Sequence, residues 1–332
     1  MLLWSGFVIC TVLIVYSGGR LSKYGDIIAE KTGMGRSWIG VVLMASVTSL
    51  PELITGISSV TFAGVPDIAV GDLLGACVFN MATLAVLDSL HRPVPLSAKA
   101  HHGHILSGGF GIILLAIVAA SLFLADMTSP IGWIGPYTLL IIPLYLVAMR
   151  LLYAYEKRQL VAYVKEVAAE LRYERISTRE AVTKYCLNAA VVVVAAVFLP
   201  RIGEGIAETT GLGQTFVGTI FIAFATTLPE LTVSISAVRM GAVDLAVGNL
   251  FGSNIFNILI LAVGDLFFTH GPLLSSVGEG HIISALSAIA MTAIAVIGLT
   301  YRAEKKPLFL AWDSVGILLV YLLNLMVLYR LR

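Results

Sequence analysis

The chain has 332 residues, of which 58% are hydrophobic and only 12% are charged, and its mean hydropathy is +0.94. Soluble domains carry about 25% charged residues, so this composition excludes a water-soluble enzyme and indicates an integral membrane protein. The 21 Lys+Arg and 20 Asp+Glu residues give a net charge of +1, which excludes the basic field expected of a nucleic-acid-binding protein. The three cysteines have no CxxC spacing, so neither a disulfide framework nor a zinc site is expected.

Charged and Gly/Pro-rich stretches divide the chain into about ten apolar segments, each suited to a membrane helix of about 20 residues. The first has no basic residue before it and no cleavage site after it, and is predicted to be a spanning helix rather than a signal peptide. The predicted segments are residues 2–17, 37–62, 68–90, 104–124, 130–154, 181–199, 214–238, 244–268, 281–300 and 309–329. The prediction is an all-α membrane protein of about ten transmembrane helices.

One long polar stretch interrupts the apolar segments. Residues 156–180 are predicted to be a charged cytoplasmic linker between helices 1–5 (residues 1–155) and helices 6–10 (residues 181–332). When successive loops are assigned to alternate sides of the membrane, 18 of the 21 Lys+Arg residues fall on one side and three on the other. Cytoplasmic loops carry the excess of Lys and Arg, so the linker is predicted to be cytoplasmic, with both termini outside the cell membrane.

Internal repetition is the strongest signal in the sequence. GVVLMASVTSLPELITGIS, at residues 40–58, aligns with GTIFIAFATTLPELTVSIS, at residues 218–236. GDLLGACVFNMATLAVLD, at residues 71–88, aligns with GNLFGSNIFNILILAVGD, at residues 248–265. The copies begin five helices apart and therefore run in opposite directions. This predicts two inverted five-helix repeats with a substrate site near the membrane midplane, as in many secondary transporters.

Two carboxylates occupy matching places in these repeats. Glu52 and Glu230 fall in the middle of apolar segments, where an ionised carboxylate costs at least ~2.5 kcal/mol. Pro51 and Pro229 precede them, and each proline removes a helical hydrogen bond. The carbonyl groups that lose their partner are tolerated at membrane depth only where protein, water or an ion satisfies them. A carboxylate and free carbonyl oxygens are thus expected together at each break.

Further oxygen donors share these places. Thr48 lies four residues before Glu52, as Thr226 does before Glu230, so each pair shares a helix face. The helix that follows each break adds an asparagine, Asn80 in the first repeat and Asn257 in the second. The hydroxyl groups of Ser49, Thr227 and Ser253 are the remaining predicted donors. An all-oxygen set with two carboxylates suits Ca²⁺, and Na⁺ or H⁺ can use the same oxygens in its absence. Interhelical hydrogen bonding is the structural alternative for the asparagines.

At these residues the chain resembles the sodium/calcium exchangers of the cation/calcium antiporter superfamily. The resemblance rests on SLPE at residues 49–52, TLPE at residues 227–230 and GNLFGSNIFN at residues 248–257, and extends over nearly the whole chain. It implies Ca²⁺ ligands at Glu52, Glu230, Thr48 and Thr226, with Asn80 and Asn257 lining the middle of the site. It also implies flanking Na⁺ sites at Ala45, Ser49, Ala223, Thr227 and Ser253, and sliding of the first and sixth helices across a rigid bundle.

The first repeat departs from the family pattern. Ala76 stands where a hydroxyl is expected at one flanking Na⁺ site, which leaves the Na⁺ stoichiometry open. A proton-coupled relative also has paired Glu and paired Asn residues, so H⁺ coupling is the main alternative to Na⁺ coupling. An intramembrane hydrolase, which would need paired carboxylates sharing a proton, is a distant alternative. The resemblance implies no cofactor. The expected partners are inorganic cations and the lipid bilayer, with no nucleic acid and no obligatory protein partner.

Two features outside the repeats' centres are given structural roles. His101, His102 and His104 are predicted to lie in a solvated loop, with a metal or pH-sensing site as the alternative. Asp88 and Asp265 recur at helix ends and are predicted to be caps or interfacial pairs.

Overall fold

The computed structural model describes residues 2–31, 48–163, 176–306 and 309–331, and Ala45 therefore lies outside the described residues. All named elements in these ranges are helices. The first repeat contains α1 (Leu2–Lys31), α3 (Leu50–Ser58), the π-helix η1 (Ser59–Ala63), α4 (Pro66–Leu90), α5 (Leu96–Lys99), α6 (Gly103–Phe123), η2 (Ala125–Met127) and α7 (Pro136–Tyr163). The second contains α8 (Thr178–Thr210), α9 (Gln214–Val217), the π-helix η3 (Gly218–Ile222), α10 (Ala223–Arg239), α11 (Val243–Phe267), η4 (Leu273–Ser276), α12 (Gly280–Tyr301) and α13 (Trp312–Leu331).

The predicted all-α membrane fold is confirmed. Within the described residues, nine helices are long and apolar enough to cross a membrane, and Leu50–Ala63 forms a shorter apolar helix. Large apolar side chains on the outside of the bundle are more than half exposed, among them Leu146, Val194 and Leu319. Such a surface is stable when lipid rather than water covers it.

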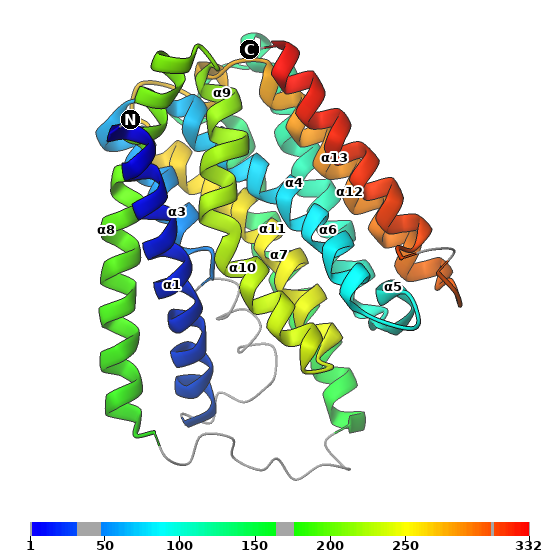
Figure 1. Cartoon of the computed structure of the whole chain (residues 1–332). Coiled ribbons are helices and arrows are strands. Elements are labelled where there is room, and N and C mark those ends of the chain that lie inside the picture. Colours follow the sequence, from blue (N-terminus) through cyan, green and yellow to red (C-terminus); the bar gives the residue numbers. More distant parts are fainter. Residues whose placement is uncertain (1, 32–47, 164–175, 307–308, 332) are drawn as a thin grey trace.

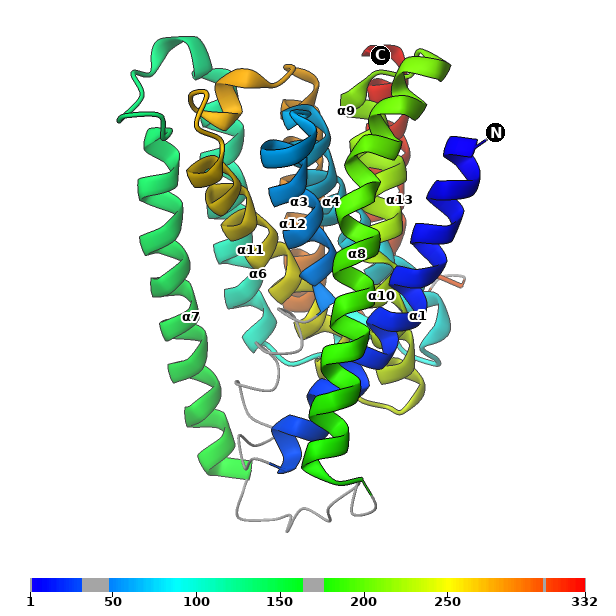
Figure 2. The ribbon, with the colours of Figure 1, turned by 90° about the vertical axis from the view of Figure 1, so that its left-hand side faces the viewer.

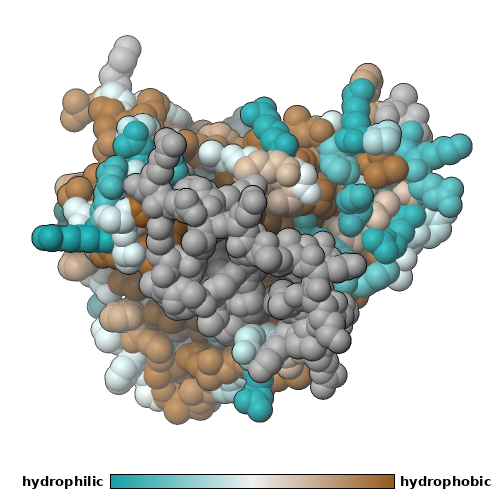
Figure 3. Space-filling view, turned by 90° about the horizontal axis from the view of Figure 1, so that it is seen from below, coloured by the Kyte–Doolittle hydropathy of each residue, from teal (hydrophilic) through white to brown (hydrophobic). Residues whose placement is uncertain are grey.

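The chain ends agree with an even number of crossings. The N- and C-termini lie at one end of the bundle, and the C-terminal end of α7 and the N-terminal end of α8 lie at the other (Figure 1). Seen from that second end, hydrophilic side chains gather around the rim between hydrophobic flanks (Figure 3). The predicted cytoplasmic linker connects α7 and α8, and its residues 164–175 lie outside the described residues.

Several helices extend further than hydropathy predicts. Apolar segment 2–17 lies in a helix that continues to Lys31, and segment 181–199 lies in one that reaches Thr210. Segment 130–154 starts before its helix, which runs from Pro136 to Tyr163. Hydropathy detects the apolar part of a helix, whereas the helical backbone continues into polar sequence and, in α8, past Pro200, which lies inside the helix.

The helices divide into a main bundle and a pair at its edge. α4, α6, α7, α11, α12 and α13 contribute to one hydrophobic core, whereas α1 and α8 pack along each other around a second, to which α4, η3 and α10 also contribute. The two helices lie side by side at one edge of the molecule (Figure 1). Gly6 faces Ile202 and Gly205 faces Leu3 across this contact, so small residues let the two long helices approach closely.

The central helices cross at glycines. A Cβ atom added to Gly75 of α4 would lie 2.7 Å from the Cβ of Ala223 and 2.8 Å from the Cα of Thr219 in η3. One added to Gly71 would lie 3.1 Å from the Cα of Gly218. Such distances leave no room for a side chain. The face of α4 that carries Gly71 and Gly75 is therefore the surface on which this helix meets the second repeat.

Replacing Gly75 by Ala is expected to destabilise the protein by about 1–3 kcal/mol, because overpacking must move the α4 or η3 backbone. Thermal unfolding of the purified protein in detergent measures the effect. Gly109→Ala is the matched control, since nothing lies within 4 Å of a Cβ added there. Equal unfolding temperatures for the two variants would contradict the close crossing.

Two equivalent Asp and His pairs connect the repeats at opposite ends of the bundle. His281 Nε2, at the start of α12, lies 3.0 Å from Asp67 Oδ1, in the first turn of α4. His104 Nε2, at the start of α6, lies 3.1 Å from Asp244 Oδ1, in the first turn of α11. Each carboxylate also accepts a backbone N–H, from Gly278 and His101 respectively.

These pairs correct one prediction from the sequence. His104 is buried, so the prediction of a solvated loop residue is wrong for it, whereas His101 and His102 are exposed. One pair joins the start of α4 to α12, and the other joins the start of α11 to α6, so each pair links the two repeats. The pairs therefore fix the positions of the two most buried membrane-length helices among those described.

Asp88 and Asp265 also occupy equivalent places. Each accepts the backbone N–H of a residue eight positions later: Leu96 donates to Asp88 at 2.8 Å, and Leu273 donates to Asp265 at 2.7 Å. The prediction of caps or interfacial pairs is confirmed for both. Their other partners differ, because Asp265 accepts the hydroxyl of Tyr137 at 2.5 Å.

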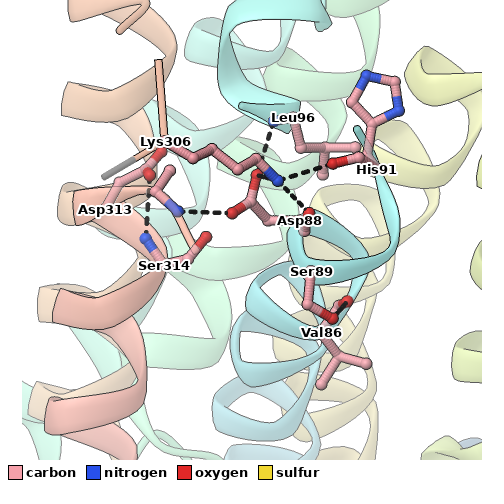
Figure 4. A network of polar contacts seen from close by, with 9 residues as sticks. Val86, Asp88, Ser89, His91, Leu96, Lys306, Asp313 and Ser314 are labelled. Carbon is pink, nitrogen blue, oxygen red and sulfur yellow. Dashed lines mark hydrogen bonds and ion pairs between the residues drawn. The ribbon is translucent and has the colours of Figure 1, made fainter. Parts of the chain in front are cut away.

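Asp88 is paired with a lysine instead. Lys306 Nζ lies 2.9 Å from Asp88 Oδ1, and the two side chains are 5% and 3% exposed. Lys306 also donates to the carbonyl groups of Asp88 and His91 (Figure 4). Ala311 donates its backbone N–H to the second Asp88 oxygen at 2.8 Å. This buried ion pair attaches the start of α13 to the end of α4.

Candidate functional site

The first break lies at the start of α3. Ser49 precedes the helix with φ −85° and ψ 14°, outside the helical region, and Pro51 occupies the first turn. Proline is tolerated there because the first N–H groups of a helix have no intrahelical partner. Glu52 follows directly and is 0% exposed. The sequence thus begins a helix at membrane depth and places a carboxylate in its first turn.

The second break lies inside α10. Pro229 is within the helix, and π-helix η3 precedes α10. Because Pro229 has no N–H, the carbonyl of Ala225 loses its usual helical donor. π-helical turns are frequent at functional sites. Glu230 follows the proline and is 0% exposed, so both predicted carboxylates are fully buried beside a helix break.

The two repeats meet at these breaks. Ser49 donates its hydroxyl to Glu230 Oε1 at 3.0 Å, across 181 residues of sequence. Thr227, the equivalent of Ser49, lies beside Glu52 but donates to the carbonyl of Ala223 at 2.5 Å. Each break thus places a hydroxyl residue next to the carboxylate of the other repeat, as expected for a site on the axis that relates them.

The two carboxylates are incompletely satisfied. Among the described residues, both oxygens of Glu52 and Oε2 of Glu230 are buried and have no hydrogen-bond partner. Among the ion pairs that the described residues form, none includes either glutamate. A buried charge without a partner costs several kcal/mol. The free oxygens are therefore suited to bind a cation.

The predicted asparagines lie on the two helices that follow the breaks. Asn80 of α4 donates to Oδ1 of Asn254 at 3.0 Å, while its own Oδ1 is unpartnered. Both polar atoms of Asn257 in α11 are buried without a partner. The interhelical hydrogen bond that was the structural alternative thus exists for Asn80, yet its carbonyl oxygen remains free. Asn254, which follows Ser253, was missed in the sequence although its amide joins α4 to α11.

The remaining predicted residues fall into three groups. Thr48 is buried, lies beside Glu230 and is 3.5 Å from Oδ1 of Asn249. Ala223 and Ser253 are both 0% exposed, and the Ser253 hydroxyl has no partner. Thr226 contacts a residue outside the predicted set, Asp72 of α4, to which it donates at 2.8 Å.

Asp72 is the functional candidate that sequence reasoning missed. It is 0% exposed, and the Glu52 and Glu230 carboxylates lie close enough to interact with it electrostatically. The signal was present in the repeat alignment, where Asp72 matches Asn249 and places a carboxylate inside an apolar span. The two repeat copies differ at this position, so Asp72 does not stand out among the residues that are identical in both copies.

The donor set fits a hard cation. Unpartnered carboxylate, amide and hydroxyl oxygens come from α3, α4, α10 and α11, and α4 contacts the other three helices near the centre of the bundle (Figure 2). Within the described residues, no three Asp, Glu, His or Cys side chains form a metal-binding group by themselves. A cation here would therefore need neutral oxygens in addition to carboxylates, which Ca²⁺ and Na⁺ accept.

Sequence comparison identifies relatives over most of the chain. The profile of the family described as "Sodium/calcium exchanger protein" matches residues 2–153 and 185–330. The putative antiporter CaxA of Alkalimonas amylolytica is 28% identical over 260 residues, which cover 77% of each chain. The sodium/calcium exchanger MaX1 of Methanosarcina acetivorans is 36% identical over 145 residues, which cover 43% of this chain and 39% of that protein.

Solved structures share the fold. A sodium–calcium exchanger, NCX_Mj, superposes with a TM-score of 0.61 and 20% identity over 97% of both chains. The H⁺/Ca²⁺ exchanger CAX superposes with a TM-score of 0.72 and 13% identity, over 99% of this chain and 85% of that one. These likenesses establish the architecture of inverted five-helix repeats.

Proposed function

This chain belongs to the sodium/calcium exchanger family, and from that premise we propose that it is a secondary active antiporter that exchanges Ca²⁺ for Na⁺. The observation that carries the proposal is the pair of fully buried carboxylates, Glu52 and Glu230, which occupy equivalent breaks and retain unpartnered oxygens. Two carboxylates balance the charge of one Ca²⁺ ion. When Ca²⁺ leaves, they need monovalent cations instead, and this mutual exclusion is the physical basis of exchange.

The ligand assignment follows the oxygen chemistry. Glu52 and Glu230 bind Ca²⁺ with Thr48 and Thr226, and Asn80 and Asn257 line the middle of the site. The flanking Na⁺ sites involve Ser49, Ala223, Thr227 and Ser253, together with Ala45 outside the described residues. Free oxygens on Glu52, Glu230, Asn80, Asn257 and Ser253 support this assignment.

Alternating access is proposed to use the α1 and α8 pair. These two helices have their own hydrophobic contact and lie beside the main bundle. A Cβ atom added to Gly18 of α1 would lie 2.7 Å from the Pro229 ring, so α1 crosses the second break directly. Movement of α1 past this point would change access to the neighbouring Glu230.

H⁺ coupling is the alternative for the monovalent ion. It is favoured by the likeness in fold to the H⁺/Ca²⁺ exchanger CAX, and by Ala76, which contributes no hydroxyl. Na⁺ coupling is favoured by the family match and by the hydroxyl residues that surround the carboxylates. In either case the proposed location is the cell membrane, with both termini outside and the linker in the cytoplasm.

Transport into sealed vesicles separates the two coupling ions. The purified protein, reconstituted into liposomes, is expected to take up radiolabelled Ca²⁺ when Na⁺ is loaded inside and diluted outside. An outward H⁺ gradient without Na⁺ is expected to drive much less uptake. Uptake driven by H⁺ alone would replace Na⁺ by H⁺ in the proposal, and no gradient-driven uptake of Ca²⁺ would overturn it.

A further inference from the structure

Asp72 is a buried carboxylate, whereas the equivalent residue of the second repeat, Asn249, is a neutral amide. Asn249 donates from Nδ2 to Ser234 at 3.2 Å, and its Oδ1 lies 3.5 Å from the Thr48 hydroxyl. Asp72 accepts from Thr226 at 2.8 Å through Oδ1, but its Oδ2 is buried without a hydrogen-bond partner. The two repeats thus share a contact between the break threonine and the crossing helix, with a neutral amide in one and a carboxylate in the other.

Within the described residues, no cationic side chain forms an ion pair with this carboxylate. Its electrostatic neighbour is another acid, Glu230. The crossing at Gly71 and Gly75 brings the η3 backbone against the same helix, which leaves little room for a long side chain. An ionised carboxylate in such a tightly packed place needs either a proton or a small bound cation to offset its charge.

The balance of charges at the site also favours a bound monovalent cation beside Asp72. Glu52, Glu230 and Asp72 interact electrostatically, and three negative charges exceed the charge of one Ca²⁺ ion by one. Asp72 also lies four residues before Ala76, on the same face of α4. A carboxylate therefore lies one helical turn from the place where the first repeat lacks a hydroxyl.

We propose that Asp72 is a further ligand of the site and binds Na⁺ at the crossing of α4 and α10, together with the Thr226 hydroxyl. This inference rests on the proposed Ca²⁺ and Na⁺ exchange and names one more residue for it. The Thr226 hydroxyl is also 3.1 Å from the carbonyl of Ile222 and 3.2 Å from that of Ala223. Its proton can turn to these carbonyl groups, leaving both Asp72 oxygens and the hydroxyl lone pairs for the cation.

Two measurements on the full chain in liposomes test this assignment. The first is exchange of radiolabelled Ca²⁺ for internal Ca²⁺ without a Na⁺ or pH gradient, and the second is Na⁺-driven Ca²⁺ uptake as a function of Na⁺ concentration. Asp72→Asn is expected to raise the half-saturating Na⁺ concentration about tenfold or more. This change should exceed any change in the half-saturating Ca²⁺ concentration. Glu279→Gln also replaces a carboxylate by an amide, at an exposed residue that precedes α12, and is expected to leave the Na⁺ dependence unchanged.

The outcomes distinguish this inference from the proposed function. A wild-type Na⁺ dependence in Asp72→Asn would overturn the assignment of Asp72 as a Na⁺ ligand but not the proposed function. The same holds if Ca²⁺–Ca²⁺ exchange falls as much as Na⁺-driven uptake, or if only the H⁺ dependence changes. A wild-type protein without Na⁺-driven uptake would overturn the proposed Na⁺ coupling itself. If Asp72→Asn does not fold, the exchanged variant with Asp72→Asn and Asn249→Asp keeps the total charge. It is expected to transport Ca²⁺ with an altered Na⁺ dependence, and an unaltered one would overturn the assignment.

Discussion

Replacing Glu52 or Glu230 by Gln is expected to abolish gradient-driven Ca²⁺ transport. Glutamine keeps the size of the side chain but removes one of the two charges that balance Ca²⁺. A contact to a charged group contributes about 1.5–3 kcal/mol, so the Ca²⁺ affinity should fall by roughly 10–100-fold. Both glutamates are 0% exposed, and water therefore cannot replace the lost ligand easily.

Ca²⁺ binding by calorimetry and uptake by reconstituted vesicles measure the two consequences separately. The matched control is Glu279→Gln, at an exposed residue that precedes α12, and it is expected to bind and transport as the wild type does. Retained uptake in both Glu52→Gln and Glu230→Gln would contradict the assigned site.

Replacing Lys306 by Ala is expected to destabilise the protein by about 3–5 kcal/mol, because the change leaves the charge of Asp88 buried without its partner. The ammonium group is 2.9 Å from Asp88 Oδ1, and both side chains are almost fully buried. The backbone contact from Ala311 to Asp88 depends on the same carboxylate. We therefore expect the attachment of α13 to α4 to weaken first.

Unfolding of the purified variants by heat or denaturant measures this loss, with the neighbouring exposed Lys305→Ala as the control. The double variant with Asp88→Asn and Lys306→Met removes both charges and is expected to be more stable than Lys306→Ala. An unfolding temperature for Lys306→Ala equal to that of Lys305→Ala would show that the ion pair contributes nothing to stability.

Much of the fold could be predicted from residues taken one segment at a time. Apolar length gave the spanning helices, and the two prolines marked breaks beside Glu52 and Glu230. Helix ends were less accurate, as at Lys31 and Tyr163, because hydropathy detects the apolar part of a helix rather than backbone hydrogen bonding. The residue boundaries of the two repeats and the linker remain predictions.

Polar groups whose partners lie far away in sequence were harder to predict. The hydropathy pattern places Lys306 in a loop, yet its side chain is buried and forms an ion pair with Asp88, more than 200 residues away in the sequence. His104 was treated as a solvated residue, yet it contacts Asp244 in the other repeat. Nothing in the local sequence of either residue distinguishes a buried partner from solvent.

The membrane class, the inverted repeats and the two carboxylates follow from the amino-acid sequence alone, because composition, each copy of a motif and each helix break are recognisable within a short stretch of chain. Which polar groups meet depends on the tertiary packing. It placed Ser49 against Glu230 and Thr226 against Asp72, contacts that arise when helices of opposite direction pack across the centre of the bundle. The excess of cations in some loops first served to orient the chain, but the structure assigns one of them, Lys306, to the interior, where its charge offsets that of Asp88.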